Sequence, residues 1–218
     1  MMCRLIRNLV LGVSVALGIF ASGATSASEP SSAPDPAHAL NSRPLLDALR
    51  KGGYTLYFRH TSTDFSKLDG AMRDYRDCAN QRMLSDKGRD EARLIGRAIA
   101  ELKIPVGEVL ASPYCRTSET ATLMFGRATA DNAIREEAGN NYAALKRLLA
   151  KPVGAAGVNR AIVGHGTPFR AIAGPPHLAE GEAAVLKPLG ERYVVVARIA
   201  LGDWATLADA TKKVEAHR

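Results

Sequence analysis

From about residue 44 onward, the chain alternates between short hydrophobic runs typical of strands and longer stretches whose hydrophobic residues recur at helical spacing. Strands are predicted at residues 54–59, 109–111 and 160–163, and a hairpin at 183–186 and 193–199. Helices are predicted at residues 44–51, 86–102, 116–125 and 141–150, with a last helix that Asp203 caps and that runs through residue 208. This alternation predicts an α/β fold, a three-layer α/β/α sandwich with a mostly parallel central sheet.

Residues 44–218 are predicted to form one domain, because no internal repeat and no linker divides them. Ser85 precedes the longest predicted helix, and a serine hydroxyl at that place accepts a hydrogen bond from the first helical turn. Residues 28–43 are rich in Ser, Pro and Ala, and we expect them to be a flexible leader outside the fold.

Residues 1–27 are typical of a signal peptide. Arg4 and Arg7 supply the positive charge, residues 9–20 are largely apolar, and small residues allow cleavage after Ala24 or at the end of the segment. The apolar stretch is shorter than the ~20 residues that span a bilayer. We therefore expect an exported protein, periplasmic or secreted, that meets a membrane only through this segment if it stays uncleaved.

Charge and composition narrow the possible partners. The 218 residues include 29 Lys and Arg against 22 Asp and Glu, a formal net charge of +7. This excess suits an anionic ligand, but it is too diffuse to require nucleic acid. Aromatic residues make up 6% of the chain, with one tryptophan, which is few for a surface that stacks on bases. We expect no nucleic-acid partner.

Removal of the signal peptide would also remove Cys3 and leave two cysteines, Cys78 and Cys115. In an oxidising compartment, such a pair favours a disulfide. We expect a Cys78–Cys115 bond that closes a loop of roughly 37 residues, worth ~3–4 kcal/mol in the chain-entropy model. The alternative is two buried free thiols.

Cationic and imidazole side chains follow the three strands that are predicted to be parallel. Arg59 is the last residue of the first strand and His60 follows it, while Arg116 follows the second strand and His165 the third. Because ligands bind beyond the carboxyl ends of such strands, we expect these side chains to gather at one edge of the sheet. Only residues 117–164 separate Arg116 from His165, which leaves little room for a large cap domain and predicts an open site.

These residue types suit phosphoryl transfer. Guanidinium groups bind phosphate oxygens bidentately and keep their charge at neutral pH. A neutral imidazole is a competent nucleophile, and its attack on phosphorus gives a phosphohistidine that water then hydrolyses. Since two arginines supply the positive charge, no metal ion or other cofactor is expected. The residues alone do not say whether His60 or His165 attacks.

Four motifs occur in order between residues 58 and 166: Phe58-Arg59-His60-Thr61, Leu84-Ser85-x-x-Gly88-x-x-x-Ala92, Ser112-Pro113-x-x-Arg116-x-x-Glu119-Thr120-Ala121 and Val163-Gly164-His165-Gly166. Together they resemble the histidine phosphatase superfamily, which has the phosphoglycerate mutase-like fold. The resemblance implies that His60 is the nucleophile that becomes phosphorylated, and that Arg59, Arg116 and His165 form the rest of the phosphate pocket. Thr61 stands where the family usually has glycine, which reaches positive φ more easily.

The general acid stays open. Many members of the family carry a glutamate after the helix that follows the second arginine, and Glu136 in Ile134-Arg135-Glu136-Glu137 fits that place. Asp64, four residues after His60, is the alternative, and it is also a candidate substrate-binding residue. Surface charge is the commoner role of such carboxylates.

We therefore expect an exported, metal-independent phosphatase that hydrolyses a phosphomonoester through a phosphohistidine on His60. An open site is compatible with a phosphorylated small molecule, glycan or protein as the substrate. The alternative is a protein of the same fold that binds phosphate or an anionic glycan without turnover, which the absence of a general acid would favour.

Overall fold

The computed structural model describes residues 43–135 and 141–216, all of which belong to the second of two compact units, Ala33–Arg218. The predicted signal peptide, nearly all of the predicted leader and Glu136 lie outside the described residues. In the described part of the chain, no helix has both the length and the apolar character of a membrane span.

Six described strands form one sheet in the order β3-β2-β4-β1-β5-β6. They are β1 (Thr55–Arg59), β2 (Val106–Ala111), β3 (Thr129–Ala130), β4 (Asn159–Gly164), β5 (Ala183–Pro188) and β6 (Tyr193–Ile199). The first four pair in parallel, and the predicted hairpin of β5 and β6 joins β1 in antiparallel fashion. Val163 of β4 is level with both Phe58 of β1 and Ala111 of β2, so these three strands end side by side.

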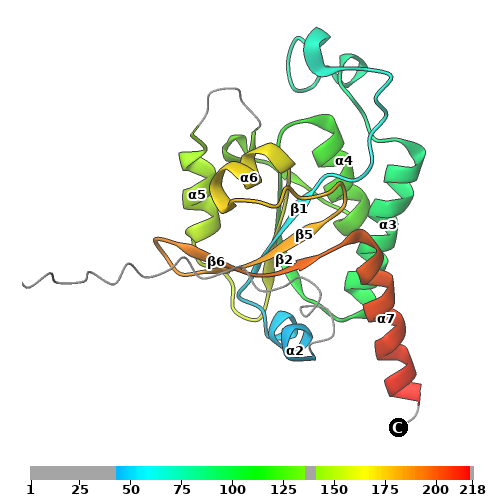
Figure 1. Ribbon diagram of the computed structural model, residues 1–218, viewed down its shortest axis with the longest axis vertical. Helices are drawn as coiled ribbons and strands as arrows, with labels where there is room; N and C mark the ends of the chain where they lie inside the picture. Colours follow the sequence, from blue (N-terminus) through cyan, green and yellow to red (C-terminus); the bar gives the residue numbers. More distant parts are fainter. Residues whose placement is uncertain (1–42, 136–140, 217–218) are drawn as a thin grey trace, which may run out of the picture. The chain divides into compact units, whose positions relative to one another are not determined.

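Helices cover both faces of the sheet, which confirms the three-layer prediction (Figure 1). One face carries α3 (Asp86–Glu101), α4 (Cys115–Phe125) and α7 (Leu201–Ala216). The other face carries α5 (Ala143–Ala150) and α6 (Gly166–Ala173). The short helix α2 (Arg43–Lys51) contributes Leu49 to the core that α3 and α4 share.

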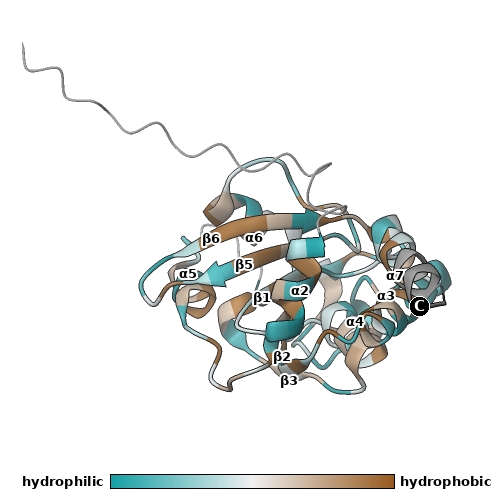
Figure 2. Ribbon diagram, turned by 90° about the horizontal axis from the view of Figure 1, so that it is seen from below, coloured by the Kyte–Doolittle hydropathy of each residue, from teal (hydrophilic) through white to brown (hydrophobic). Residues whose placement is uncertain are grey.

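The two faces of β1 enter two separate hydrophobic clusters, because successive strand residues point to opposite sides. Phe58 packs 6.0 Å from Trp204 of α7, measured between ring centroids. Tyr57 stacks on Phe169 of α6 at 4.8 Å. Figure 2 shows that much of β5 and β6 is coloured as hydrophobic, while the helices combine hydrophobic and hydrophilic stretches. The sheet is therefore buried at its centre, which fixes the ends of β1 and β4.

Helix boundaries follow the local capping chemistry. The start of α3 is as predicted, since the Ser85 hydroxyl accepts the Gly88 N–H at 3.0 Å. The helix predicted at residues 141–150 begins instead at Ala143. Tyr142 lies in the left-handed region with φ 54°, and the Asn141 side chain accepts the Ala143 N–H.

The last helix also differs from the prediction. It begins at Leu201 rather than after Asp203, and it continues to Ala216. The Asp203 carboxylate accepts the N–H of Ala200 at 3.0 Å from within the first turn. The sequence pattern predicts neither α6 nor the two-residue strand β3.

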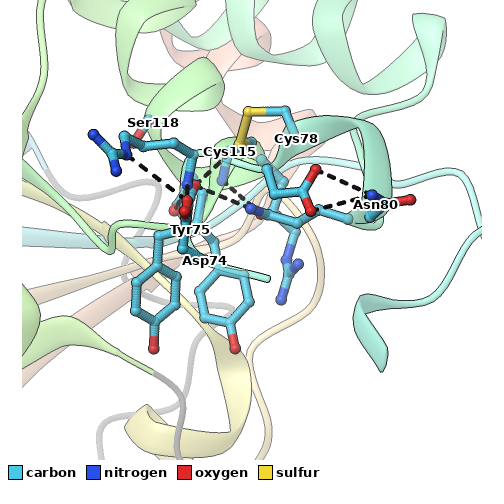
Figure 3. Close-up of a disulfide and its surroundings, with 12 residues drawn as sticks. Asp74, Tyr75, Cys78, Asn80, Cys115 and Ser118 are labelled. Atoms are coloured by element: carbon cyan, nitrogen blue, oxygen red, sulfur yellow. Dashed lines mark hydrogen bonds and ion pairs between the residues drawn. A yellow bond between two sulfur atoms is a disulfide. The ribbon is translucent and has the colours of Figure 1, made fainter. Parts of the chain in front are cut away.

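Between β1 and α3 lies the 62–83 segment, which contains two single 3-10 turns, η1 (Asp69–Ala71) and η2 (Cys78–Asn80). The predicted disulfide is confirmed: Cys78 is bonded to Cys115, the first residue of α4, with their Cα atoms 5.7 Å apart (Figure 3). The start of the segment lies against α3, where a Cβ at Gly88 would overlap the Ser62 carbonyl. This close approach explains the glycine in the second motif.

Candidate active site

The ends of β1, β2 and β4 bring His60, His165 and Arg116 together, as the sequence predicts. Each of the three residues is about 1% exposed. The rings of His60 and His165 lie 5.7 Å apart between centroids, at 70° to one another. The ring of Tyr114 lies 5.0 Å from His165 and 4.4 Å from the guanidinium carbon of Arg116. Two imidazoles and a guanidinium therefore share one buried place at the edge of the sheet.

His60 is held through its backbone and one ring nitrogen. Its N–H donates to the Gly164 carbonyl of β4, and its carbonyl accepts the Gly181 N–H, both at 3.1 Å. Its Nδ1 lies 2.9 Å from the Thr61 carbonyl. Because a carbonyl only accepts, we assign the ring proton to Nδ1. The lone pair is then on Nε2.

Both histidines are neutral at neutral pH. Burial lowers the pKa of His60 from 6.5 to about 3; the Thr61 hydrogen bond opposes this shift, and the positive charge of Arg116 adds to it. Burial also lowers the pKa of His165 well below its usual value, again with a contribution from Arg116. A neutral imidazole keeps the lone pair that nucleophilic attack needs.

His165 is positioned by two hydroxyl groups that the sequence reasoning did not single out. Tyr57 Oη accepts the His165 N–H at 3.0 Å and donates to the His165 carbonyl at 2.9 Å. Ser112, which directly follows β2, places its Oγ 2.9 Å from His165 Nε2. Tyr57 lies one residue before the Phe58-Arg59-His60-Thr61 motif, and Ser112 is the first residue of the third motif. These positions are the only signal in the sequence for either hydroxyl group.

The two motif arginines each lie beside a carboxylate. Arg116 Nη1 donates to both carboxylate oxygens of Asp69, at 2.9 and 3.0 Å. Arg59 Nη1 donates to the Leu178 carbonyl at 2.8 Å, and its Nη2 lies 3.5 Å from Glu180. The sequence pattern gives no reason to expect Asp69 here, and it indicates for Glu180 only a place near the predicted hairpin.

Glu180 is also the carboxylate nearest to the nucleophile among the described residues. It accepts the Thr63 hydroxyl at 2.9 Å and the Thr63 N–H at 3.3 Å. One of its oxygens lies 3.9 Å from His60 Nδ1. Its negative charge therefore faces the nitrogen that carries the His60 proton, on the opposite side of the ring from Nε2.

His177 lies at the rim of the site, where its Nδ1 is 3.4 Å from Arg59 Nη1. A Cβ at Gly166 would overlap the His177 ring, which explains the glycine after His165. Thr61 fits without strain: its φ is not positive, and its hydroxyl lies 3.4 Å from that of Thr120. The departure from the family's glycine therefore leaves the position of His60 intact.

Of the two candidate acids, Asp64 makes no described contact with the nucleophile. Asp64 is exposed, and its carboxylate accepts the N–H and the hydroxyl of Ser66, both at 2.8 Å. These hydrogen bonds lower the pKa of Asp64. Glu136 lies outside the described residues. Within residues 43–135 and 141–216, no three His, Cys, Asp or Glu side chains are grouped as metal ligands would be.

Comparison with known proteins rests on structure alone, because no family model and no curated protein matches the sequence. A phosphoglycerate mutase from Bacillus anthracis superposes with a TM-score of 0.53 at 12% identity, over 73% of this chain and 99% of that one. The protein histidine phosphatase SixA in complex with tungstate gives 0.50 at 18% identity, over 69% and 98%. A mycobacterial glucosyl-3-phosphoglycerate phosphatase in complex with VO3 gives 0.50 at 16% identity, over 67% and 100%. The chain therefore has the phosphoglycerate mutase-like fold, as its motifs imply.

Proposed function

We propose that the protein is an exported, metal-independent phosphatase that hydrolyses a phosphomonoester through a phosphohistidine on His60. The observation that carries the proposal is the buried, neutral pair of His60 and His165 beside the guanidiniums of Arg59 and Arg116. This arrangement supplies a nucleophile and two fixed positive charges, which are the main needs of phosphoryl transfer.

In the first step, the Nε2 lone pair of His60 attacks phosphorus while the bond to the leaving oxygen breaks. Arg59, Arg116 and His165 hold the non-bridging oxygens. The ring becomes cationic, and its Nδ1 proton is held by the Thr61 carbonyl with the Glu180 charge 3.9 Å away. In the second step, water attacks the phosphohistidine, the P–N bond breaks and its electron pair returns to Nε2. Inorganic phosphate then leaves.

The leaving oxygen takes up a proton in the first step, and the same group removes one from the attacking water in the second. We propose Glu136 for this role. Ile134, two residues earlier, is fully buried, and its side chain lies next to Gly164, the residue before His165. Asp64 suits the role less well, because its carboxylate accepts two hydrogen bonds from Ser66, and these stabilise its ionised form and lower its pKa.

Export is part of the proposal, and the Cys78–Cys115 disulfide supports it, since disulfides persist in oxidising compartments. Expression of the full chain in a bacterial host should yield a periplasmic protein whose intact mass corresponds to a chain that begins at Thr25 or Ser28. A protein that keeps residues 1–24 would contradict cleavage.

The substrate class is a phosphorylated small molecule, glycan or protein. The named relatives bind tungstate and VO3, so these oxyanions are suitable probes for this site.

The decisive experiment is hydrolysis of p-nitrophenyl phosphate by the purified mature protein in the presence of a chelator. We expect turnover that His60→Ala abolishes and that Arg116→Ala lowers by about 10²–10³-fold in kcat/KM. The matched control is Arg170→Ala, because Arg170 is an exposed arginine on α6. Rapid quenching should trap an acid-labile phosphate on the wild type and none on His60→Ala.

A folded wild type that binds tungstate but gives no turnover would overturn the proposal. That outcome would favour the alternative, a protein that binds phosphate or an anionic glycan. Turnover that survives in His60→Ala would instead move the nucleophile to another residue.

A further inference from the structure

Arg82 is a cation near the end of the 62–83 segment that no described residue neutralises. It is half-buried, and its Nε is a buried atom without a hydrogen-bond partner among the described residues. Within the same part of the chain, its guanidinium makes no ion pair. A buried donor without an acceptor costs free energy, so such an atom calls for a ligand or another function.

The neighbours of Arg82 hold it beside Arg116. The Arg82 N–H donates to Asp69 Oδ1 at 2.9 Å, and the same carboxylate binds Arg116 Nη1. Gln81, the preceding residue, accepts the N–H of Cys115 at 2.9 Å, at the start of the helix that carries Arg116. The guanidinium carbon of Arg82 lies 4.7 Å from the ring centroid of Phe65, which supports one face of the group.

The charge of Arg82 also acts on the two histidines. Besides burial, which is the largest cause, the Arg82 guanidinium lowers the pKa of both His60 and His165. Coulomb interactions weaken with distance, so the Arg82 charge is close enough to the active site to act on both imidazoles.

The charge balance of the site gives Arg82 a specific use. Arg116 is paired with Asp69, and Arg59 lies 3.5 Å from Glu180, so each motif arginine is offset by a carboxylate. Arg82 is the cation of this group that no described carboxylate offsets. An incoming phosphate dianion needs net positive charge and hydrogen-bond donors, and the Arg82 guanidinium supplies both.

We propose that Arg82 is a third arginine of the anion site, which binds oxygens of the substrate's phosphoryl group together with Arg59 and Arg116. This inference rests on the proposed function for the identity of the ligand. It assigns to the 62–83 segment, and not only to the strand ends, a direct contact with the substrate.

The test compares Arg82→Gln and Arg82→Lys with Arg76→Gln. Arg76 is an arginine of the same segment whose side chain is 94% exposed, so it serves as the matched control. Two quantities are measured: the inhibition constant of tungstate against p-nitrophenyl phosphate hydrolysis, and the affinity for tungstate and inorganic phosphate by calorimetry. We expect Arg82→Gln to weaken tungstate binding on the order of 10- to 100-fold, the usual loss for a hydrogen bond between charged groups. The tungstate affinity of Arg82→Lys should lie between those of Arg82→Gln and the wild type. The tungstate affinity of Arg76→Gln should stay within about twofold of the wild type.

The outcomes separate this inference from the proposed function. An active wild type whose Arg82→Gln variant binds tungstate as tightly overturns the inference alone. A wild type that binds tungstate without turnover overturns the proposed function, and the calorimetric comparison still decides the role of Arg82. A wild type that binds neither oxyanion overturns both. Circular dichroism and a thermal melt show whether each variant is folded. Unfolding is unexpected, because the Arg82 guanidinium makes no ion pair within the described part of the chain and its backbone bond to Asp69 is kept in every variant.

Discussion

The residues at the strand ends and those of the 62–83 segment reach the same site, but different forces hold them there. His60, His165 and Arg116 are buried at the end of a sheet whose central strands are covered on both faces. The 62–83 segment leaves two large apolar side chains exposed, Phe65 at 63% and Leu68 at 72%. Hydrogen bonds among its own residues and one disulfide hold it in place.

This difference separates two tasks of the site. Hydrophobic burial of the sheet fixes the nucleophile and its partners, so the chemistry is built into the fold. The 62–83 segment adds Asp69 and Arg82 around Arg116 through specific polar contacts. Changes in such a segment alter the ligand contacts at little cost to the core. We therefore expect the strand ends to determine the reaction and the segment to determine the affinity for the anion.

The largest test of this division is removal of the disulfide. The double variant Cys78→Ser/Cys115→Ser opens a loop with a sequence separation of 37. We expect it to lower the free energy of unfolding by ~3–4 kcal/mol, because the unfolded chain gains conformational freedom. Urea unfolding followed by circular dichroism measures the loss.

The same variant separates the two regions. If the strand ends determine the reaction, the folded variant keeps its kcat on p-nitrophenyl phosphate while its affinity for tungstate falls. Dithiothreitol should produce the same loss of stability in the wild type and no further loss in the double variant. A variant that loses kcat as completely as His60→Ala would show that the sheet alone does not hold the catalytic groups.

The sequence predicts the strand ends better than it predicts the contacts of the 62–83 segment. The hydrophobic runs at β1, β2 and β4 predict parallel strands, and their ends place Arg59, His60, Arg116 and His165 together. The two cysteines that lie outside the predicted signal peptide predict the disulfide, because each has only the other as a partner. These predictions depend on patterns that are local in the chain.

What the sequence could not predict depends on contacts between distant residues. Thr63 and Glu180 are 117 positions apart, and Tyr57 and His165 are 108 apart, so no local pattern reveals either pair. Helix α6 is not predicted by the sequence pattern, and Pro168 lies inside it. The proline falls in the first turn, however, where its missing N–H has no helical partner to lose. For Arg82, the only signal was its place two residues before the Leu84-Ser85 motif.

A smaller effect concerns the burial of the nucleophile. An unfolded histidine takes up a proton near pH 6.5, while folded His60 does so only near pH 3, so acid favours the unfolded chain between these values. The contribution of His60 to the free energy of unfolding should therefore be complete above pH 6.5. Below pH 6.5 this contribution should fall by ~1.4 kcal/mol per pH unit. Urea unfolding of His60→Gln at several pH values should show a slope that is shallower by this amount. Wild-type and variant curves that run parallel would mean that His60 titrates normally in the folded protein.

The smallest expected effect is that of an acid in the exposed part of the segment. Asp64→Asn removes a carboxylate charge whose hydrogen bonds, within the described part of the chain, go to Ser66 alone, so we expect kcat/KM to stay within about twofold of the wild type. The measurement uses two substrates, p-nitrophenyl phosphate and an alkyl phosphate. An aryl leaving group needs little protonation, whereas an alkoxide depends on the general acid.

The pair of substrates makes this small effect informative. Glu136→Gln is the matched variant, and it should lower kcat on the alkyl phosphate by about 10²–10⁴-fold while leaving the aryl phosphate much less affected. If Asp64→Asn instead shows this selective loss and Glu136→Gln does not, the general acid belongs to the 62–83 segment. The division between chemistry at the strand ends and affinity in the segment would then fail, because the segment would supply a proton as well as a cation.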